Sequence, residues 1–180
     1  MIYAAIKFLQ EWSSPLTIVN YVLLGTASSF TLAAAFSSYT APDLVKFFSV
    51  WAIIITVMAF ITRSASLIRN ARIKYKSSIQ TAIGVRHNKI VQNAQVAMGG
   101  SYNTREYFHG KSAMFLRSIK WLFMMLVFPL PIILLSSAMD DSNGAVLLAA
   151  FIVQYVGLLA ERWFFFAQAN HPQNIYYQTV

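Results

Sequence analysis

The sequence predicts an all-α integral membrane protein: a helical bundle of about four transmembrane helices with one long basic connection. The chain of 180 residues is 57% hydrophobic and only 11% charged, whereas about 25% of the residues in an average soluble domain are charged. Four apolar stretches carry no charged side chain, at residues 12–42, 47–62, 121–139 and 142–160. Because a charge at the bilayer centre costs about 3 kcal/mol on insertion scales, these stretches indicate helices surrounded by lipid.

Each stretch is close to the roughly 20 residues that a helix needs to cross the hydrocarbon core. We therefore expect a single membrane domain over residues 1–180, in which segment 63–118 connects the second span to the third. The four spans are expected near residues 16–39, 44–62, 119–138 and 144–166.

The first span is expected to begin after the run Ser13–Pro15. Serine caps helix N-termini through its hydroxyl, and proline suits the first helical position because an N–H there has no helical acceptor. Gly25, Ser29 and Ala33 recur every four residues within this span. Such spacing puts small side chains on one face, which favours the close approach of another helix.

The next two spans carry their own signals. Asp43 suits the N-terminus of the second span, because an acid there complements the helix dipole. Continued helical spacing of isoleucines predicts that this helix runs on beyond the membrane, at Ile68, Ile73 and Ile79. In the third span Pro129 and Pro131 remove backbone donors and predict a kink, best interpreted as a packing bend without a function of its own.

The basic residues are gathered in one segment. Residues 63–120 hold eleven of the fourteen Lys and Arg residues and one acid, whereas the short connections 37–43 and 140–143 hold acids and no base. The positive-inside rule places connection 63–118 and both chain ends in the cytoplasm and both short turns outside. Clustered Lys and Arg residues also mark nucleic-acid binding, but the flanking membrane spans argue against it.

Little in the sequence predicts chemistry by this chain alone. The three histidines, His87, His109 and His171, lie outside the apolar spans, so no haem is expected at membrane depth, where two imidazoles would have to face each other. We expect no metal site, since cysteine is absent and no histidine has a partner at metal-ligand spacing. Phosphate-binding and nucleophile-elbow motifs are missing too, so we expect no catalytic residue.

The most unusual segment is 160–178, which closes the last span with aromatic residues and embedded polar groups. It fits three interpretations: an interfacial anchor, a quinone-binding pocket with proton-exchanging groups, or a docking surface for a peripheral subunit. The candidate quinone-site or docking residues are Glu161, Arg162, His171 and Tyr176. Adjacent helical residues point about 100° apart, so Glu161 and Arg162 are expected to meet different partners.

Three segments carry a family resemblance. The tail from Glu161 to Tyr177 resembles the closing motif of DmsC-type membrane anchors of molybdenum oxidoreductases, and segments 1–17 and 81–84 are similar to that family too. Within the family, residues 8–12 and 169–174 look most like the anchors of cytoplasmic sulfite dehydrogenases. Because those anchors are longer, the chain resembles their carboxyl-terminal part, with further spans expected before it.

The resemblance implies a complex of three subunits in the bacterial inner membrane. A catalytic subunit would hold molybdopterin, a ferredoxin-like subunit would hold iron–sulfur clusters, and the anchor would exchange electrons with quinone, either ubiquinone or menaquinone. Sulfite oxidation to sulfate is the reaction implied first. The alternatives are quinol oxidation in a dimethyl sulfoxide reductase-type complex, and a membrane anchor or assembly protein without a redox role. A transporter is disfavoured, since no ionisable residue is expected in mid-span.

Overall fold

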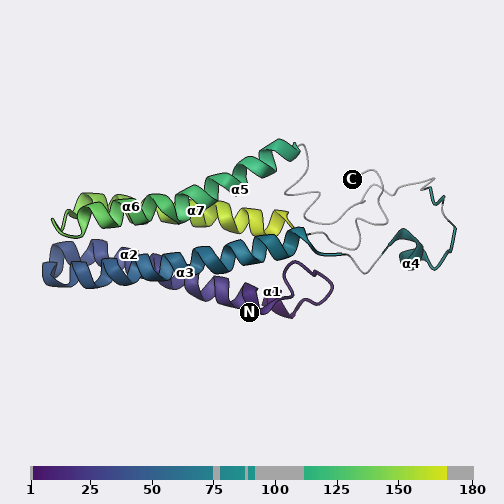
Figure 1. Ribbon diagram of the computed structural model, residues 1–180, viewed down its shortest axis with the longest axis horizontal. Coiled ribbons are helices and arrows are strands. Elements are labelled where there is room, and N and C mark those ends of the chain that lie inside the picture. Colours follow the sequence, from purple (N-terminus) through teal and green to yellow (C-terminus); the bar gives the residue numbers. More distant parts are fainter. Residues whose placement is uncertain (1, 75–77, 88, 92–111, 170–180) are drawn as a thin grey trace.

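The computed structural model describes residues 2–74, 78–87, 89–91 and 112–169. All regular elements in those ranges are helices, which confirms the all-α prediction. The long helices lie side by side in an elongated bundle, and the short helix α4 (Ile79–Ile83) lies beyond one end of it (Figure 1). We call this the connector end: α2 begins there, and α3 and α7 finish there.

The amino-terminal elements are a short helix α1 (Ile2–Ala5) and the long helix α2 (Pro15–Thr40). The start of α2 follows the expected chemistry. Ser14 has an extended backbone and its hydroxyl accepts the Leu16 N–H at 3.2 Å. Pro15 occupies the first helical turn, where its missing N–H leaves no acceptor unsatisfied.

The second long segment consists of a 3-10 turn, η1 (Pro42–Leu44), followed by α3 (Val45–Ala71). Asp43 lies in the first turn of η1, as expected. The helix continues past residue 62, so the predicted extension is present as far as Ala71. It stops before Ile73, and Ile79 instead begins the separate helix α4.

The third segment is divided at its prolines into α5 (Ala113–Val127) and α6 (Pro129–Ala138). Phe128, between them, has φ −109° and ψ −75°. Pro131 has no N–H to donate to the carbonyl of Val127, four residues earlier. That oxygen instead lies 3.4 Å from Nε2 of Gln154, which donates from α7. The expected kink is therefore confirmed, and a side chain of another helix compensates for it.

The fourth long segment is α7 (Gly144–Ala167). Asn143 caps its start, accepting the Val146 N–H at 3.4 Å. The turn before it is linked to the start of α3 by an exposed ion pair between Lys46 and Asp140, with 3.2 Å between nitrogen and oxygen.

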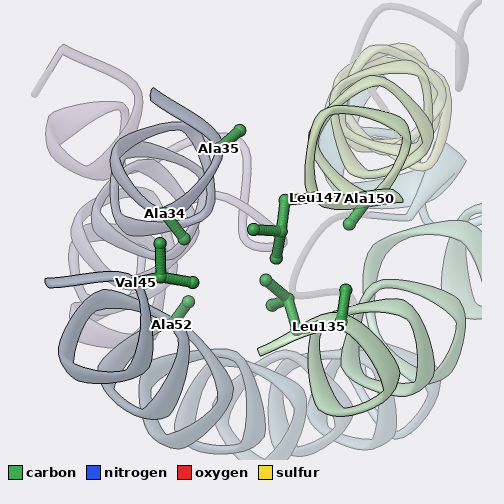
Figure 2. Close-up of a cluster of buried hydrophobic side chains, with 8 residues drawn as sticks. Ala34, Ala35, Val45, Ala52, Leu135, Leu147 and Ala150 are labelled. Atoms are coloured by element: carbon green, nitrogen blue, oxygen red, sulfur yellow. The ribbon is translucent and has the colours of Figure 1, made fainter. Parts of the chain in front are cut away.

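The bundle core lies between two helix pairs. Helix α2 packs along α3, α7 packs along α5 and α6, and contacts between α2 and α7 join the pairs. Figure 2 shows that small and branched side chains from four helices lie between them. This cluster is near the end of the bundle opposite the connector end, which we call the far end. The buried residues of this cluster are Ala34, Ala35, Val45, Ala52, Leu135, Ala138, Leu147 and Ala150.

The close helix contact lies at a different glycine from the one expected. A Cβ added to Gly157 would lie 2.7 Å from Cβ of Leu126, so α7 and α5 approach each other there. A Cβ added to Gly25 would meet nothing within 4 Å, and Ser29 is exposed. The prediction that Gly25 and Ser29 seat a neighbouring helix is wrong for the helices described, because α2 turns a different face to the core.

The outer surface of the bundle is apolar. Large hydrophobic side chains such as Phe36 and Trp121, both 66% exposed, cover the lengths of the helices. Soluble proteins do not expose apolar surface on this scale. Four helical segments are long and apolar enough to cross a membrane, and with the all-helical fold they confirm the predicted helical membrane bundle. These segments are Pro15–Thr40, Pro42–Ala71, Met114–Ala138 and Gly144–Ala167.

Candidate functional site

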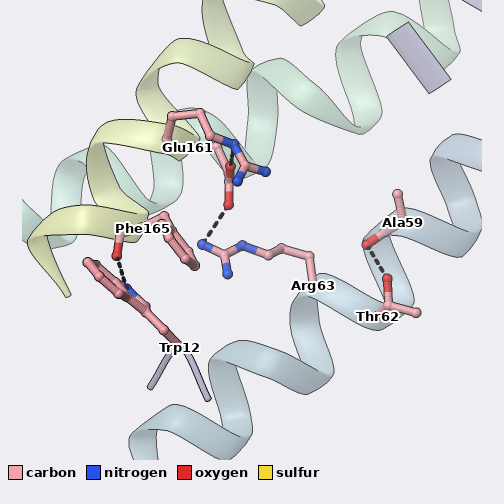
Figure 3. A network of polar contacts seen from close by, with 7 residues as sticks. Trp12, Ala59, Thr62, Arg63, Glu161 and Phe165 are labelled. Carbon is pink, nitrogen blue, oxygen red and sulfur yellow. Dashed lines mark hydrogen bonds and ion pairs between the residues drawn. The ribbon is translucent and has the colours of Figure 1, made fainter. Parts of the chain in front are cut away.

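Three charged side chains meet inside the bundle near the connector end (Figure 3). Nη2 of Arg63 lies 2.7 Å from Oε1 of Glu161, and Nε of Arg162 lies 2.9 Å from Oε2 of the same carboxylate. The side chains of Arg63 and Glu161 are only 2% and 1% exposed. We call these three residues the ion cluster. Its carboxylate holds two guanidinium groups, one on each oxygen.

Helical repeat explains why Arg63 and Glu161 face each other. Seven residues make about two turns, so residues seven apart share a helix face. Ser49, Thr56 and Arg63 are spaced in this way on α3, and all three are buried. Gln154 and Glu161 follow the same spacing on α7, and Gln154 donates to the Thr56 hydroxyl at 3.4 Å. A polar line on each helix thus faces the other across the core.

The expectation that Glu161 and Arg162 would not pair is wrong. Their backbone positions diverge as predicted, but the arginine side chain is long enough to fold back along the helix surface. Its guanidinium lies over the ring of Tyr21 in α2, with Cζ 3.7 Å from the ring centroid. This cation–π contact helps to hold the side chain where Nε meets the carboxylate.

Aromatic rings enclose the ion cluster. Cζ of Arg63 lies 5.6 Å from the ring centroid of Phe123, and Cζ of Arg162 lies the same distance from that of Phe165. The low-polarity surroundings strengthen every charge interaction inside them. They also make an unpaired donor costly. Nε of Arg63 and Nη1 of Arg162 are such donors, buried without a hydrogen-bond partner.

The loop before α2 closes the connector end. The indole N–H of Trp12 donates to the Phe165 carbonyl at 3.0 Å. Phe165 lies in the last turn of α7, where carbonyls have no helical donor. From α3, Nη2 of Arg69 donates to the carbonyls of Gln10 and Ser13 at 3.0 and 3.4 Å. The loop therefore binds the ends of both helices beside the ion cluster.

The structure places the four predicted site residues unevenly. Glu161 and Arg162 lie together in the ion cluster, whereas His171 and Tyr176 lie outside the described residues. Sequence reasoning missed Arg63, which it grouped with the basic connection, and Tyr21. A signal for Arg63 existed: it immediately follows the uncharged stretch 47–62, at two-turn spacing from Thr56. In the described ranges no group of three or more His, Asp or Glu residues could hold a metal ion.

Two cavities of about 370 Å³ each lie outside the cluster. The amino-terminal cavity lies between α1 and the start of α2 and is lined by Ile2, Tyr3, Ala4, Thr17 and Tyr21. The proline cavity lies between α3 and the break from α5 to α6. Its lining consists of apolar and aromatic side chains, namely Val57, Phe60, Trp121, Met124, Met125, Phe128, Pro129 and Ile132.

Together, the apolar helices and the buried ion cluster define a class: a multi-pass helical membrane protein with a polar site inside its bundle. Over all 180 residues the chain is 53% identical to the C subunit of the sulfite dehydrogenase of Allochromatium vinosum. The chain spans about half of that curated relative's length, 55%. No protein-family model and no solved structure matches the chain. The predicted likeness to a sulfite dehydrogenase subunit is thus supported, and the DmsC-type label stays a prediction.

Proposed function

We propose that this chain is a membrane anchor subunit of a sulfite-oxidising complex and passes electrons to quinone. The observation that carries the proposal is the 53% identity, across the whole chain, to the C subunit of a sulfite dehydrogenase. The four apolar helices supply the membrane attachment that an anchor requires. The partners proposed are a ferredoxin-like iron–sulfur subunit and a molybdopterin-containing catalytic subunit.

The connector end is the proposed docking side for these partners. Arg69 and Arg72 lie at the end of α3, at the start of the strongly basic segment. Positive charge on this side favours an acidic partner surface through electrostatic complementarity. By the positive-inside rule this end would face the cytoplasm, where sulfite would be oxidised to sulfate.

The ion cluster gives the proposed electron exchange a polar site within the apolar bundle. A quinone needs hydrogen-bond donors for its carbonyl oxygens and an apolar route for its isoprenoid chain. Arg63 and Arg162 place guanidinium donors inside the bundle, and Glu161 pairs with both of them. Ionisable residues kept inside membrane helices in this way are typically functional.

The test compares membranes that contain the intact complex with membranes from which this chain has been deleted. Sulfite is added as donor, and the reduction of a short-chain ubiquinone analogue is followed spectrophotometrically. We expect reduction only with the chain present, and at least a tenfold loss in Glu161→Gln when immunoblots show normal assembly. Control Lys46→Gln, at the exposed ion pair, should retain full activity.

Two results would favour the alternatives. Quinol oxidation with dimethyl sulfoxide, in place of sulfite-driven quinone reduction, would indicate a reductase anchor. The chain could also copurify with an iron–sulfur subunit in a complex that neither reduces quinone nor is inhibited by quinone analogues. That result would indicate an anchor with no redox role.

A further inference from the structure

The proline cavity is wholly apolar and runs along one half of the membrane span. It measures about 370 Å³, and every side chain that lines it is apolar. Its wall on the third segment extends over eleven positions, from Trp121 to Ile132, or about 16 Å of helix. The hydrocarbon core of a bilayer is about 30 Å thick, so the cavity has the depth of one leaflet. A hydrocarbon chain from that leaflet fits this depth, whereas a transmembrane partner helix would need a groove along the full span.

The break between α5 and α6 creates the cavity. Helix α6 packs on α3, whereas α5 packs mainly on α7 and leans away from α3 toward the connector end (Figure 1). The rings of Phe60 and Phe128 close the floor of the cavity, edge to face with their centroids 5.2 Å apart. Above this floor Trp121 and Met125 are more than half exposed, so the cavity opens toward lipid.

Two basic side chains lie at the connector-end mouth of this cavity. Arg117, Trp121 and Met125 follow each other at four-residue spacing, so they share one face of α5. The amino group of Lys120 lies over the ring of Trp121, with Nζ 6.0 Å from the ring centroid. Tryptophan is enriched at the membrane–water interface, where the headgroups of phospholipids lie. The apolar cavity therefore meets positive charge at the level of the headgroups.

The charge at the mouth has no counter-charge within the described part of the chain. No ion pair among the described residues involves Arg117 or Lys120. The described acids at the connector end are Glu11 and Glu161, and both are buried. An anion from outside the chain is therefore needed to complement the two bases. The phosphate of an anionic lipid supplies one at this level of the membrane.

We infer that the proline cavity and the two bases form a binding site for an anionic phospholipid of the leaflet at the connector end. Arg117 and Lys120 bind the phosphate, and one acyl chain lies in the cavity against Trp121 and Phe128. The bound chain fills the space that the proline break leaves between α5 and α3. The site is separate from the ion cluster and does not depend on the proposed redox function.

The test uses the full chain, together with the subunits that copurify with it, in phosphatidylcholine vesicles. These vesicles contain a minor share of phosphatidylglycerol with a photoreactive diazirine in one acyl chain. After illumination and trypsin digestion, label in the cavity falls in peptide 47–63 or 121–162. We expect label in these peptides, displaced by unlabelled phosphatidylglycerol and not by added phosphatidylcholine. Equal displacement by the two lipids would overturn the inference, because the site would then not distinguish an anionic headgroup.

Matched charge variants test the headgroup contact. Arg117→Gln combined with Lys120→Gln removes both charges at the mouth, and the label is then read in peptide 112–162 because two cleavage sites are lost. We expect labelling to fall about fivefold for each charge removed. The control, Arg72→Gln combined with Lys74→Gln, removes the same charge just after α3 and should leave labelling unchanged. Equal losses in the two double variants would overturn the inference, because overall charge would then attract the lipid.

A second pair of variants tests the acyl-chain contact without a change of charge. Val57→Trp fills the cavity from α3. Ile61→Trp, one turn further along the same helix, is an exposed position outside the lining. We expect Val57→Trp to lose most of the labelling and Ile61→Trp to retain it. Undiminished labelling of Val57→Trp would overturn the inference.

A probe inside the cavity separates a lipid from a partner helix. Because the chain has no cysteine, Met125→Cys can carry a single benzophenone in native membranes. We expect illumination to give an adduct between the chain and a phospholipid. A cross-link to another polypeptide would overturn the inference, because a partner helix would then occupy the cavity.

Discussion

Glu161 is the residue on which the polar interior depends. Its two oxygens contact Arg63 and Arg162, and its side chain is 1% exposed. Taking charges out of water is expensive, so such a pair persists only when the geometry is good. Removing the carboxylate would leave two guanidinium groups in an apolar surrounding without a counter-charge. The stability of the connector end should therefore respond strongly to this residue.

We predict that Glu161→Met lowers the free energy of unfolding by about 3–5 kcal/mol. Arg63→Met should also destabilise. The double variant should lose about 1–3 kcal/mol less than the sum of the two single losses, because the buried Arg63 is no longer left without its counter-charge and only the partly exposed Arg162 remains unpaired. Unfolding by dodecyl sulfate in mixed micelles, followed by circular dichroism, measures all three.

The exposed pair of Lys46 and Asp140 provides the control for that cycle. Both side chains are about 70% exposed, so Asp140→Asn should change stability by less than about 1 kcal/mol. Strictly additive losses for Arg63→Met and Glu161→Met would contradict a direct interaction between the two residues.

At the residue scale, sequence reasoning found two of the three residues of the ion cluster. It selected Glu161 and Arg162 because both interrupt an apolar, aromatic segment. It could not find Tyr21, since nothing in a single sequence indicates which aromatic residue of α2 faces α7. It also assigned Arg63 to the connection, because an arginine at the edge of a span usually extends toward water. Here the helix rotation turns it inward.

Among the elements, α7 depends on a glycine where it crosses α5. A Cβ at Gly157 would lie within 3.0 Å of three atoms of Leu126 and Val127, one of them in the backbone. A Cβ added at Gly25 in α2 would have no other atom within 4 Å. The two glycines are thus a natural pair of test sites, one at a helix crossing and one on the outer surface.

We predict that Gly157→Ala costs about 1–3 kcal/mol, because α5 and α7 must move apart to admit the methyl group. Gly25→Ala should be neutral or stabilise by up to about 1 kcal/mol, since alanine favours a helix over glycine. Thermal unfolding of the two variants in detergent gives the comparison. Equal losses at both positions would show that α2 meets a further neighbour at Gly25 or that α7 does not approach α5.

The break between α5 and α6 gives a second prediction about elements. Gln154 donates to the carbonyl of Val127, which Pro131 leaves without a helical donor. Gln154→Leu should destabilise the protein by about 1–3 kcal/mol, the cost of a buried acceptor without a partner. Pro131→Ala restores an N–H at that position and should reduce the loss.

A double-mutant cycle over Gln154→Leu and Pro131→Ala measures this coupling. A loss for Gln154→Leu that is identical with and without Pro131→Ala would contradict it, because the side chain would then act only through Thr56.

At the element scale the sequence was informative about ends and breaks. Ser14, Pro15 and Pro129 act through local backbone chemistry, so their effects can be read without a neighbour. Gly25 misled because a small residue permits close approach but does not specify which helix approaches. The role of Gln154 could not be predicted either, because the sequence does not show which helix it faces. Its acceptor is the Val127 carbonyl, which is left without a helical donor by Pro131, 23 positions before Gln154 in the chain.

For the whole molecule, orientation in the membrane is the prediction that matters for docking. The chain contains no cysteine, so single cysteines can be introduced without a background. Asp141→Cys lies in the acidic turn before α7, and Arg72→Cys lies just after α3. In intact cells a membrane-impermeant maleimide should label Asp141→Cys alone, and Arg72→Cys should react only after permeabilisation. Labelling in the reverse order would contradict the positive-inside assignment.

The apolar helices found among the described residues could be predicted because lipid imposes one strong requirement, the absence of charge over a span. Their pairing could not, because any apolar face can pack against any other. The pairing of α2 with α3 and of α7 with α5 and α6 is what brings Arg63 and Tyr21 to Glu161 and Arg162. The arrangement of the site is therefore a property of the bundle as a whole.

The loop before α2 has a mechanical consequence. Trp12 is bonded to the last turn of α7, and Arg69, from the last turn of α3, is bonded to the same loop. Two helix ends that lie 96 positions apart in the sequence, at Ala71 and Ala167, are thus bonded to one short loop. A force applied to α3 or α7 from outside the membrane would be transmitted to the other helix through this loop, so the two helix ends would move together.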